Sequence, residues 1–183
     1  MIRSTILSFL IALATAPGVA LAQGDSSGRA ALVHNALSAA PPSVAAHAAV
    51  VLPTGETLRE GTNGYTCMPD DPAVPNNAPM CLDASWQELI DAWMTRRQPR
   101  VTRMGISYML QGDIPVSNTD PFATAPTPDN AWIQAGPPHL MIVMPDPSML
   151  EGYSTDPANG GPWVMWKGTA YAHLMVPTVP RQD

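Results

Sequence analysis

The chain has 183 residues, a formal net charge of −6 and a single lysine, Lys167. Proteins that bind nucleic acid use clustered Lys and Arg side chains to neutralise phosphates, so this composition argues against a nucleic-acid partner. Four arginines do gather near the end of a predicted helix, where they are typical of a solvated face that complements the helix C-terminus. They are Arg96, Arg97, Arg100 and Arg103.

The first 22 residues have the features of a cleavable secretory signal peptide. Arg3 precedes an apolar stretch over residues 6–14, and Ala20-Leu21-Ala22 has the small-x-small pattern that signal peptidase reads. We expect cleavage after Ala22, which leaves residues 23–183 as one globular domain in the periplasm or outside the cell. No later stretch approaches about 20 uninterrupted apolar residues, so the sequence predicts no stable membrane span.

The chain contains two cysteines, Cys67 and Cys81. An even number of cysteines in a chain destined for an oxidising compartment favours a disulfide bond between them. The alternative, a pair of thiolate metal ligands, lacks the close C-x-x-C spacing and the nearby histidines that zinc sites use. The sequence therefore predicts one disulfide.

Two helices are predicted before residue 100. One runs near Arg29 to Ala39 and ends at a Pro-Pro pair. The other begins with a capping box over Ser85–Glu88. Apolar residues then follow the spacing of one helical face, so we expect them to anchor the helix in the core. These residues are Trp86, Leu89, Ile90, Trp93 and Met94.

Several strand-like segments surround the two helices, and helices and strands do not alternate regularly. This order predicts an α+β fold with a mostly antiparallel sheet, two main helices, long Pro-rich loops and one disulfide. The last segment contains a bend at Gly168 and could form a hairpin. The predicted strands are Ala46–Leu52, Tyr65–Met68, Val101–Leu110, His139–Met144 and Trp163–Val176.

Asp-Pro pairs occur four times, at residues 71–72, 120–121, 146–147 and 156–157. An aspartate that caps a turn or helix, followed by proline at the first turn position, is a common way to begin such an element. We therefore interpret the four aspartates as structural.

Two near-copies in the C-terminal third, His139-Leu140-Met141 and His173-Leu174-Met175, form the main candidate site. Side chains alternate along a strand, so in each copy the His and the Met share a face. If the two strands are neighbours, the four side chains form a set of imidazole and thioether ligands suited to copper, Cu(I) in particular. Continuing the alternation backwards adds Lys167 and Tyr171 to the His173 face, provided that Gly168 inserts no bulge.

The leading hypothesis is an exported, non-enzymatic protein that binds a small ligand or a soft metal ion on this face. An alternative is a small exported hydrolase in which His139 or His173 is the general base, Tyr171 the proton donor and Lys167 an electrostatic stabiliser. The sequence contains no H-E-x-x-H and no phosphate-binding glycine motif that would favour the enzyme.

A third hypothesis is an interaction subunit. The residues Trp163, Met165 and Trp166 form an aromatic and Met-rich stretch of the kind that meets a protein partner.

The chain resembles a family of uncharacterised exported bacterial proteins. The resemblance is carried by Gly61–Cys67 with Pro69–Pro72, by Tyr108–Gly112, by Asn118–Pro126 and by the segment from Gly160 to Pro177. These stretches extend over most of the chain after the signal peptide. The resemblance implies export, and it implies no activity, cofactor or site residue.

Overall fold

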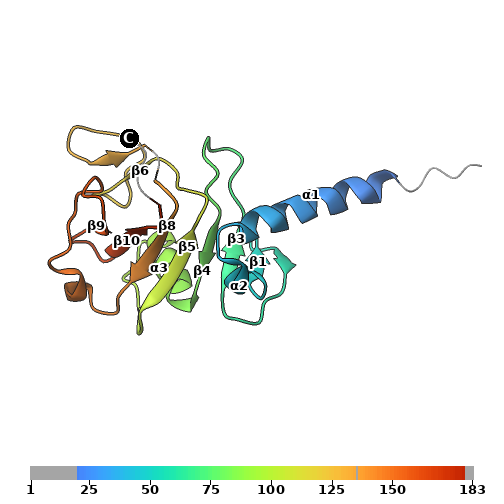
Figure 1. The fold of residues 1–183 in the computed structure, drawn as a ribbon, viewed down its shortest axis with the longest axis horizontal. Coiled ribbons are helices and arrows are strands. Elements are labelled where there is room, and N and C mark those ends of the chain that lie inside the picture. Colours follow the sequence, from blue (N-terminus) through green and yellow to red (C-terminus); the bar gives the residue numbers. More distant parts are fainter. Residues whose placement is uncertain (1–19, 135, 180–183) are drawn as a thin grey trace, which may run out of the picture.

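The computed structural model describes residues 20–134 and 136–179, and it shows an α+β fold built on one large sheet (Figure 1). The sheet has eight strands in the order β2-β1-β3-β4-β5-β8-β10-β9. Only β1 and β3 are parallel neighbours, and every other neighbouring pair is antiparallel. The predicted fold class is therefore confirmed.

The strands of this sheet are short, and their bounds are β1 Ala49–Val51, β2 Thr57–Arg59, β3 Thr66–Met68, β4 Met80–Leu82, β5 Gly105–Met109, β8 His139–Val143, β9 Trp163–Met165 and β10 His173–Pro177. The helices are α1 Ala20–Leu37, α2 Pro42–Ala45, α3 Ala84–Met94 and the 3₁₀ turn η1 Pro147–Leu150. Two further strands, β6 Val116–Ser117 and β7 Trp132–Ile133, pair in a small separate sheet.

Helices α1 and α3 cover opposite faces of the large sheet. Cys81 packs in a cluster with the end of α1, whereas the next residue, Leu82, packs with Trp86 and Leu89 of α3. Successive side chains of a strand point to opposite faces, so the two helices lie on opposite sides. We call the side that α3 covers the α3-side face. No helix in the described part of the chain is long and apolar enough to cross a membrane.

The second predicted helix is α3, but its cap differs from the prediction. The N-cap is Asp83, whose Oδ1 accepts a hydrogen bond from the Trp86 amide, so Ser85 lies inside the helix and is not its cap. Asp83 Oδ2 also accepts from the Ile106 amide, which ties the start of the helix to β5. Trp86 is 1% exposed, as expected for a core anchor, whereas Met94 is 71% exposed and lies outside the core.

The first predicted helix, near residues 29–39, corresponds to α1, which is longer and begins at Ala20. Its last turns pack on the sheet through Ala36, while its other end extends away from the rest of the fold (Figure 1).

All five predicted strand segments contain a strand, although most are shorter than predicted. The segment Trp163–Val176 is a hairpin of β9 and β10 whose connection begins at Trp166. Trp166 and Gly168 both have positive φ, at 54° and 82°. Strands β2 and β4 were not predicted, because three-residue strands between turns have too few residues to show an alternating pattern.

The four Asp-Pro pairs have the structural role that the sequence predicts. In each pair the Asp Oδ1 accepts a hydrogen bond from the backbone N–H two residues later. Asp146 is in addition the N-cap of η1, with Pro147 at the first helical position. The four aspartates are Asp71, Asp120, Asp146 and Asp156.

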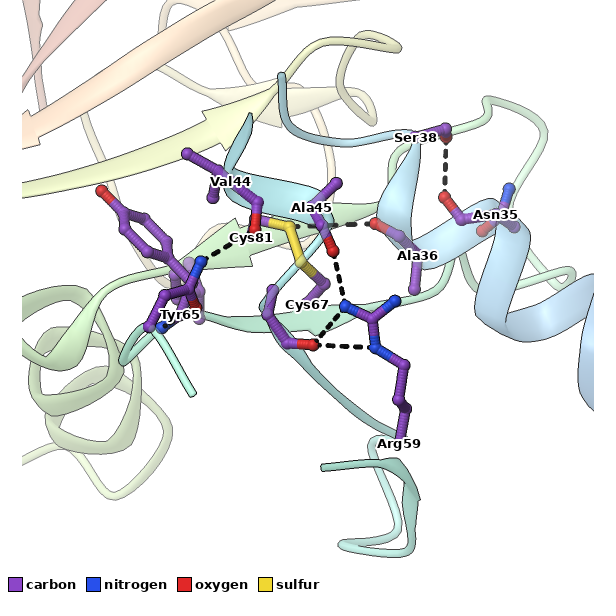
Figure 2. The surroundings of a disulfide bond; sticks show 12 residues. Asn35, Ala36, Ser38, Val44, Ala45, Arg59, Tyr65, Cys67 and Cys81 are labelled. Atoms are coloured by element: carbon purple, nitrogen blue, oxygen red, sulfur yellow. Dashed lines mark hydrogen bonds between the residues drawn. A yellow bond between two sulfur atoms is a disulfide. The ribbon is translucent and has the colours of Figure 1, made fainter. Parts of the chain in front are cut away.

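A disulfide joins Cys67 of β3 to Cys81 of β4, as predicted (Figure 2). Both cysteines are fully buried under the end of α1, where Cys81 Sγ lies 3.9 Å from the carbonyl oxygen of Ala36. Next to them the Arg59 guanidinium donates hydrogen bonds to the carbonyl oxygens of Ala45 and Ala48. The disulfide thus crosslinks the half of the sheet that α1 covers.

We expect the variant with Cys67→Ala and Cys81→Ala to lose about 3 kcal/mol of free energy of unfolding, because the crosslink restricts a short loop of the unfolded chain. The two cysteines are 14 residues apart. Urea unfolding of wild type and variant, each with and without reductant, measures the effect. Reductant should destabilise the wild type alone, and an equal urea midpoint for the reduced and the oxidised wild type would contradict the assignment.

Candidate functional site

Strands β8 and β10, which carry the two His-Leu-Met copies, are direct neighbours in the sheet. Their antiparallel register places Met141 opposite Met175. Opposed residues share a face of the sheet, as do residues two apart in one strand, so His139 and His173 lie on the same face as the two methionines. This is the α3-side face, and all four side chains are less than 10% exposed.

The same register separates the two histidines along the strands. His139 lies opposite Pro177, at one end of the pair, and His173 is level with Val143, at the other end. Four residues of strand separate these two levels, which corresponds to about 14 Å along the strand direction. The four predicted ligands therefore share a face, but the backbone places the two histidines in different surroundings.

His173 is enclosed and has one unpartnered nitrogen. Its Nδ1 lies 2.9 Å from the carbonyl oxygen of Tyr171, and because a carbonyl only accepts, Nδ1 must carry the hydrogen. Its Nε2 then has a free lone pair, and this buried atom has no hydrogen-bond partner. Burial lowers the pKa of His173 to about 4, with a smaller contribution from repulsion by His139, so the imidazole is neutral at neutral pH.

Two indole rings form the walls around His173. The rings of Trp86 and Trp166 each lie edge-to-face with the imidazole, with centroids 5.0 Å away. Trp166 adopts a φ of 54°, a conformation that costs a bulky residue about 1–2 kcal/mol. Its backbone N–H donates to Asn118 and its Nε1–H donates to Ser117, which hold it there. Such strain is often found at functional sites.

A third methionine, Met165, lies beside His173 and was not among the predicted ligands. The hairpin register places Met165 of β9 directly opposite His173, and Met165 is 3% exposed. No local sequence pattern indicates this pairing, because it depends on where the chain turns between Trp166 and Ala172. Met165 therefore lies at the level of His173, and two further buried thioethers, those of Met175 and Met141, lie two residues along the strands on the same face.

His139 has a different neighbour, Asp113. The imidazole Nδ1 donates to the carbonyl oxygen of Pro137 at 2.7 Å, and Nε2 lies 3.9 Å from Asp113 Oδ2, too far for a direct hydrogen bond. Asp113 Oδ1 accepts from the Ile114 amide. Burial raises the pKa of Asp113, and the nearby His139 partly opposes this rise. No sequence pattern pointed to Asp113, which lies in the short connection between β5 and β6.

Two other buried polar atoms belong to the same layer as the histidines and also lack a partner. They are Trp86 Nε1, from α3, and Ser107 Oγ, opposite Met141 on β5. Buried polar atoms without partners are uncommon in folded proteins, and each one calls for water, an ion or another ligand. Among the residues that the structure describes, the layer between α3 and the sheet therefore contains four such atoms, including the Nε2 atoms of His139 and His173.

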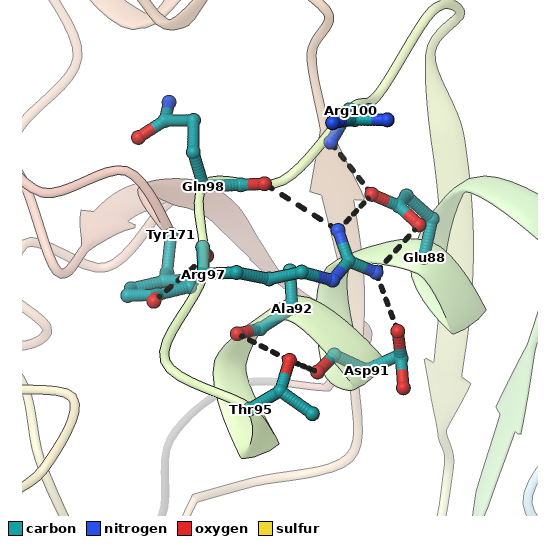
Figure 3. Close-up of polar contacts among 8 residues, drawn as sticks. All are labelled: Glu88, Asp91, Ala92, Thr95, Arg97, Gln98, Arg100 and Tyr171. Carbon is teal, nitrogen blue, oxygen red and sulfur yellow. Dashed lines mark hydrogen bonds and ion pairs between the residues drawn. The ribbon is translucent and has the colours of Figure 1, made fainter.

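Tyr171 packs in the same buried cluster as Met165 and Met175 on the α3-side face, whereas Lys167 does not join this face, because the chain turns between β9 and β10. Lys167 is exposed and lines a hollow of about 370 Å³ together with Val164 and Ala172, which pack on the opposite side of the sheet. The Tyr171 hydroxyl donates to the backbone carbonyl of Arg97 (Figure 3). Tyr171 is therefore on the α3-side face with its hydroxyl engaged, and Lys167 lies on the other side of the sheet.

Arg97, one of the four clustered arginines, forms ion pairs with Glu88 and Asp91 of α3 (Figure 3). The hydrogen bonds from Arg97, with one from the Arg100 amide, lower the pKa of Glu88 to about 2. Arg96 instead places its guanidinium 4.5 Å from the ring centroid of Phe122. The arginine cluster is therefore not only a solvated face, because Arg97 and Arg96 contact other side chains of the protein.

The stretch proposed as a partner surface is buried. Trp163, Met165 and Trp166 are 2%, 3% and 8% exposed, and they belong to the main hydrophobic cluster under α3. They offer no surface to a protein partner in this structure.

Within residues 20–134 and 136–179, no three His, Cys, Asp or Glu side chains come together as metal ligands. The side chains of the α3-side face that could bind a soft metal ion are the two imidazoles and the thioethers of Met141, Met165 and Met175. Comparisons with protein-family models, with curated proteins and with solved structures find no match to this chain.

We expect the metal-free protein to lose stability as the pH falls from about 6.5 to about 4. The unfolded chain binds a proton at His173 near pH 6.5, whereas the folded protein, with the pKa of this imidazole lowered to about 4, does not. Protonation therefore favours unfolding over this window, with a total effect of about 3 kcal/mol below pH 4.

Urea unfolding between pH 7.5 and pH 4 measures this loss, and the variant His173→Asn, whose amide can replace the Nδ1 donor, provides the comparison. The variant should lose less stability than the wild type over the same window. NMR titration measures the pKa of His173 in the wild type directly and does not depend on whether the variant folds. A His173 pKa near the ordinary value of 6.5 would contradict this expectation.

Proposed function

We propose that this chain is an exported, non-enzymatic protein that binds a small ligand, foremost a soft metal ion, in the layer between α3 and the sheet. The observation that carries the proposal is the Nε2 atom of His173. It is fully buried, it has a free lone pair and it has no partner, and it lies on the same face as buried methionines. A bound ligand would satisfy an atom that the protein itself leaves unpaired.

Binding has more support than catalysis on this face. The hydrolase alternative needs Tyr171 and Lys167 beside a histidine, but the Tyr171 hydroxyl is bonded to Arg97 and Lys167 lies on the other side of the sheet. His139 and His173 are at most 1% exposed, so a substrate would have no direct access to them. Buried imidazole acceptors beside thioethers are better suited to hold a bound ion or small molecule than to turn over a substrate.

Export is supported by the N-terminal sequence pattern and by the disulfide. The disulfide is typical of proteins from oxidising compartments. Helix α1 begins at Ala20, so cleavage after Ala22 would leave most of the helix, including Ala36, which packs against the sheet.

Native mass spectrometry of the mature protein, purified without chelators from the exporting cell, tests the binding proposal. We expect a stoichiometric extra mass on the folded monomer that is lost on denaturation, because the unpartnered atoms favour an occupied layer. An extra mass equal to that of a metal ion would identify the ligand as a soft ion. An extra mass equal to that of an organic molecule would identify it as a small ligand. A bare chain that also remains bare after incubation with Cu(I), Ag(I) and a cell extract would overturn the proposal.

The cleavage site has a separate test. N-terminal sequencing of the protein recovered from the periplasm or medium should begin at Gln23. The variant with Ala20→Asp and Ala22→Asp should remain uncleaved, because signal peptidase requires small residues at these two positions. Recovery of the wild-type chain with Met1 intact in the cytoplasm would contradict export.

A further inference from the structure

We infer that the ligand of the α3-side face is Cu(I), coordinated by His173 Nε2 and by the thioethers of Met141, Met165 and Met175. The inference rests on the proposed binding function and names the ion and its ligands. It differs from the four-residue set that the sequence suggests, because it includes Met165 and excludes His139.

The register of three neighbouring strands places these four residues together. Met165 is directly opposite His173, Met175 follows His173 by two residues on the same face, and Met141 is directly opposite Met175. Opposed residues have Cβ atoms about 5 Å apart and diagonal neighbours about 7–8 Å apart. Methionine has three flexible side-chain bonds, so all three sulfur atoms can converge on an ion beside the imidazole.

The imidazole is already oriented as a metal ligand. The hydrogen bond from Nδ1 to the Tyr171 carbonyl fixes the tautomer in which Nε2 is free. A backbone carbonyl that accepts from the other ring nitrogen is a usual partner of a metal-bound histidine. The same carbonyl also limits rotation of the ring. Together with the edge contacts from Trp86 and Trp166, it holds Nε2 in place before an ion arrives.

The charge of the surroundings selects the ion. The proposed ligands are all neutral, and the cost of burying an ion in a medium of low polarity rises with the square of its charge. A monovalent soft ion is therefore tolerated much better than Zn²⁺ or Cu²⁺, and thioethers favour Cu(I) over hard monovalent ions. Silver, as Ag(I), has the same charge and softness and does not change its oxidation state in air.

His139 is excluded from this centre by its position at the other end of the strand pair, where its Nε2 faces Asp113. The cysteines are excluded because they are joined in a disulfide on the other face of the sheet. The chain thus provides matched controls of the same residue types. His139 serves as the histidine control, and Met80 of β4, three strands away from β10, serves as the methionine control.

The experiment titrates the mature full-length protein with Ag(I), and with Cu(I) under anaerobic conditions against a chromophoric chelator. Tryptophan fluorescence reports binding, because Trp86 and Trp166 lie 5.0 Å from the imidazole that would hold the ion. Each mixture is incubated until the signal is constant, since a buried site fills through local opening. We expect one ion per chain with quenching in the wild type.

The variants Met141→Leu, Met165→Leu and Met175→Leu remove one thioether each while conserving volume, a change that costs the fold less than about 1.5 kcal/mol. Each variant should weaken Cu(I) binding by at least about tenfold, because even the loss of a group that only hydrogen-bonds to a metal ligand weakens metal affinity by about that factor. The triple variant should abolish Cu(I) binding. Met80→Leu and His139→Asn should bind as the wild type does. Circular dichroism confirms that each variant is folded.

The outcomes separate this inference from the proposed function. If the wild type is isolated with an organic molecule and binds neither Cu(I) nor Ag(I), the copper assignment is overturned and the binding function stands. If Cu(I) binds but the three Met→Leu variants bind it unchanged, or if His139→Asn abolishes binding, the ligand set is overturned. If the protein holds no ligand and binds neither ion, both fail.

Discussion

The antiparallel register between β8 and β10 determines the arrangement of the whole α3-side face. It fixes Met141 opposite Met175 and so assigns every alternate side chain of the two strands to the face under α3. A shift by one residue would move the histidines to the opposite face and the leucines to this one. Strands β5 and β9 flank the pair and pair with it in register, which prevents such a shift. The two histidines are buried as a consequence of this pairing.

Burial of unpaired polar atoms has an energetic consequence. Each unsatisfied buried group costs about 1–3 kcal/mol, and the total stability of a domain is typically about 5–15 kcal/mol. Water, an ion or another ligand that pairs with the four such atoms found among the described residues of this layer therefore stabilises the folded protein. The disulfide and the packing of α1 stabilise the half of the sheet that carries none of them. A ligand in the layer would remove much of the penalty, so binding and stability are coupled.

Sequence reasoning predicted the features that depend on local patterns. The α+β class, the disulfide, helix α3, the four Asp-Pro turns and the location of β8 follow from periodicity, spacing and turn chemistry. It failed where long-range pairing decides. The turn after Met165 separated Lys167 from the predicted face, and the same turn brought Met165 to His173. Asp113 approaches His139 through loops whose course no local pattern encodes.

In the proposed site, His173 and three methionines hold a soft monovalent ion beneath α3. A crystal structure of the mature protein soaked with Ag(I), with data collected to reveal anomalous scattering, shows directly where the ion binds. We expect one strong anomalous peak within coordination distance of His173 Nε2 and of the sulfur atoms of Met141, Met165 and Met175. A peak confined to His139 and Asp113, or to the protein surface, would contradict it.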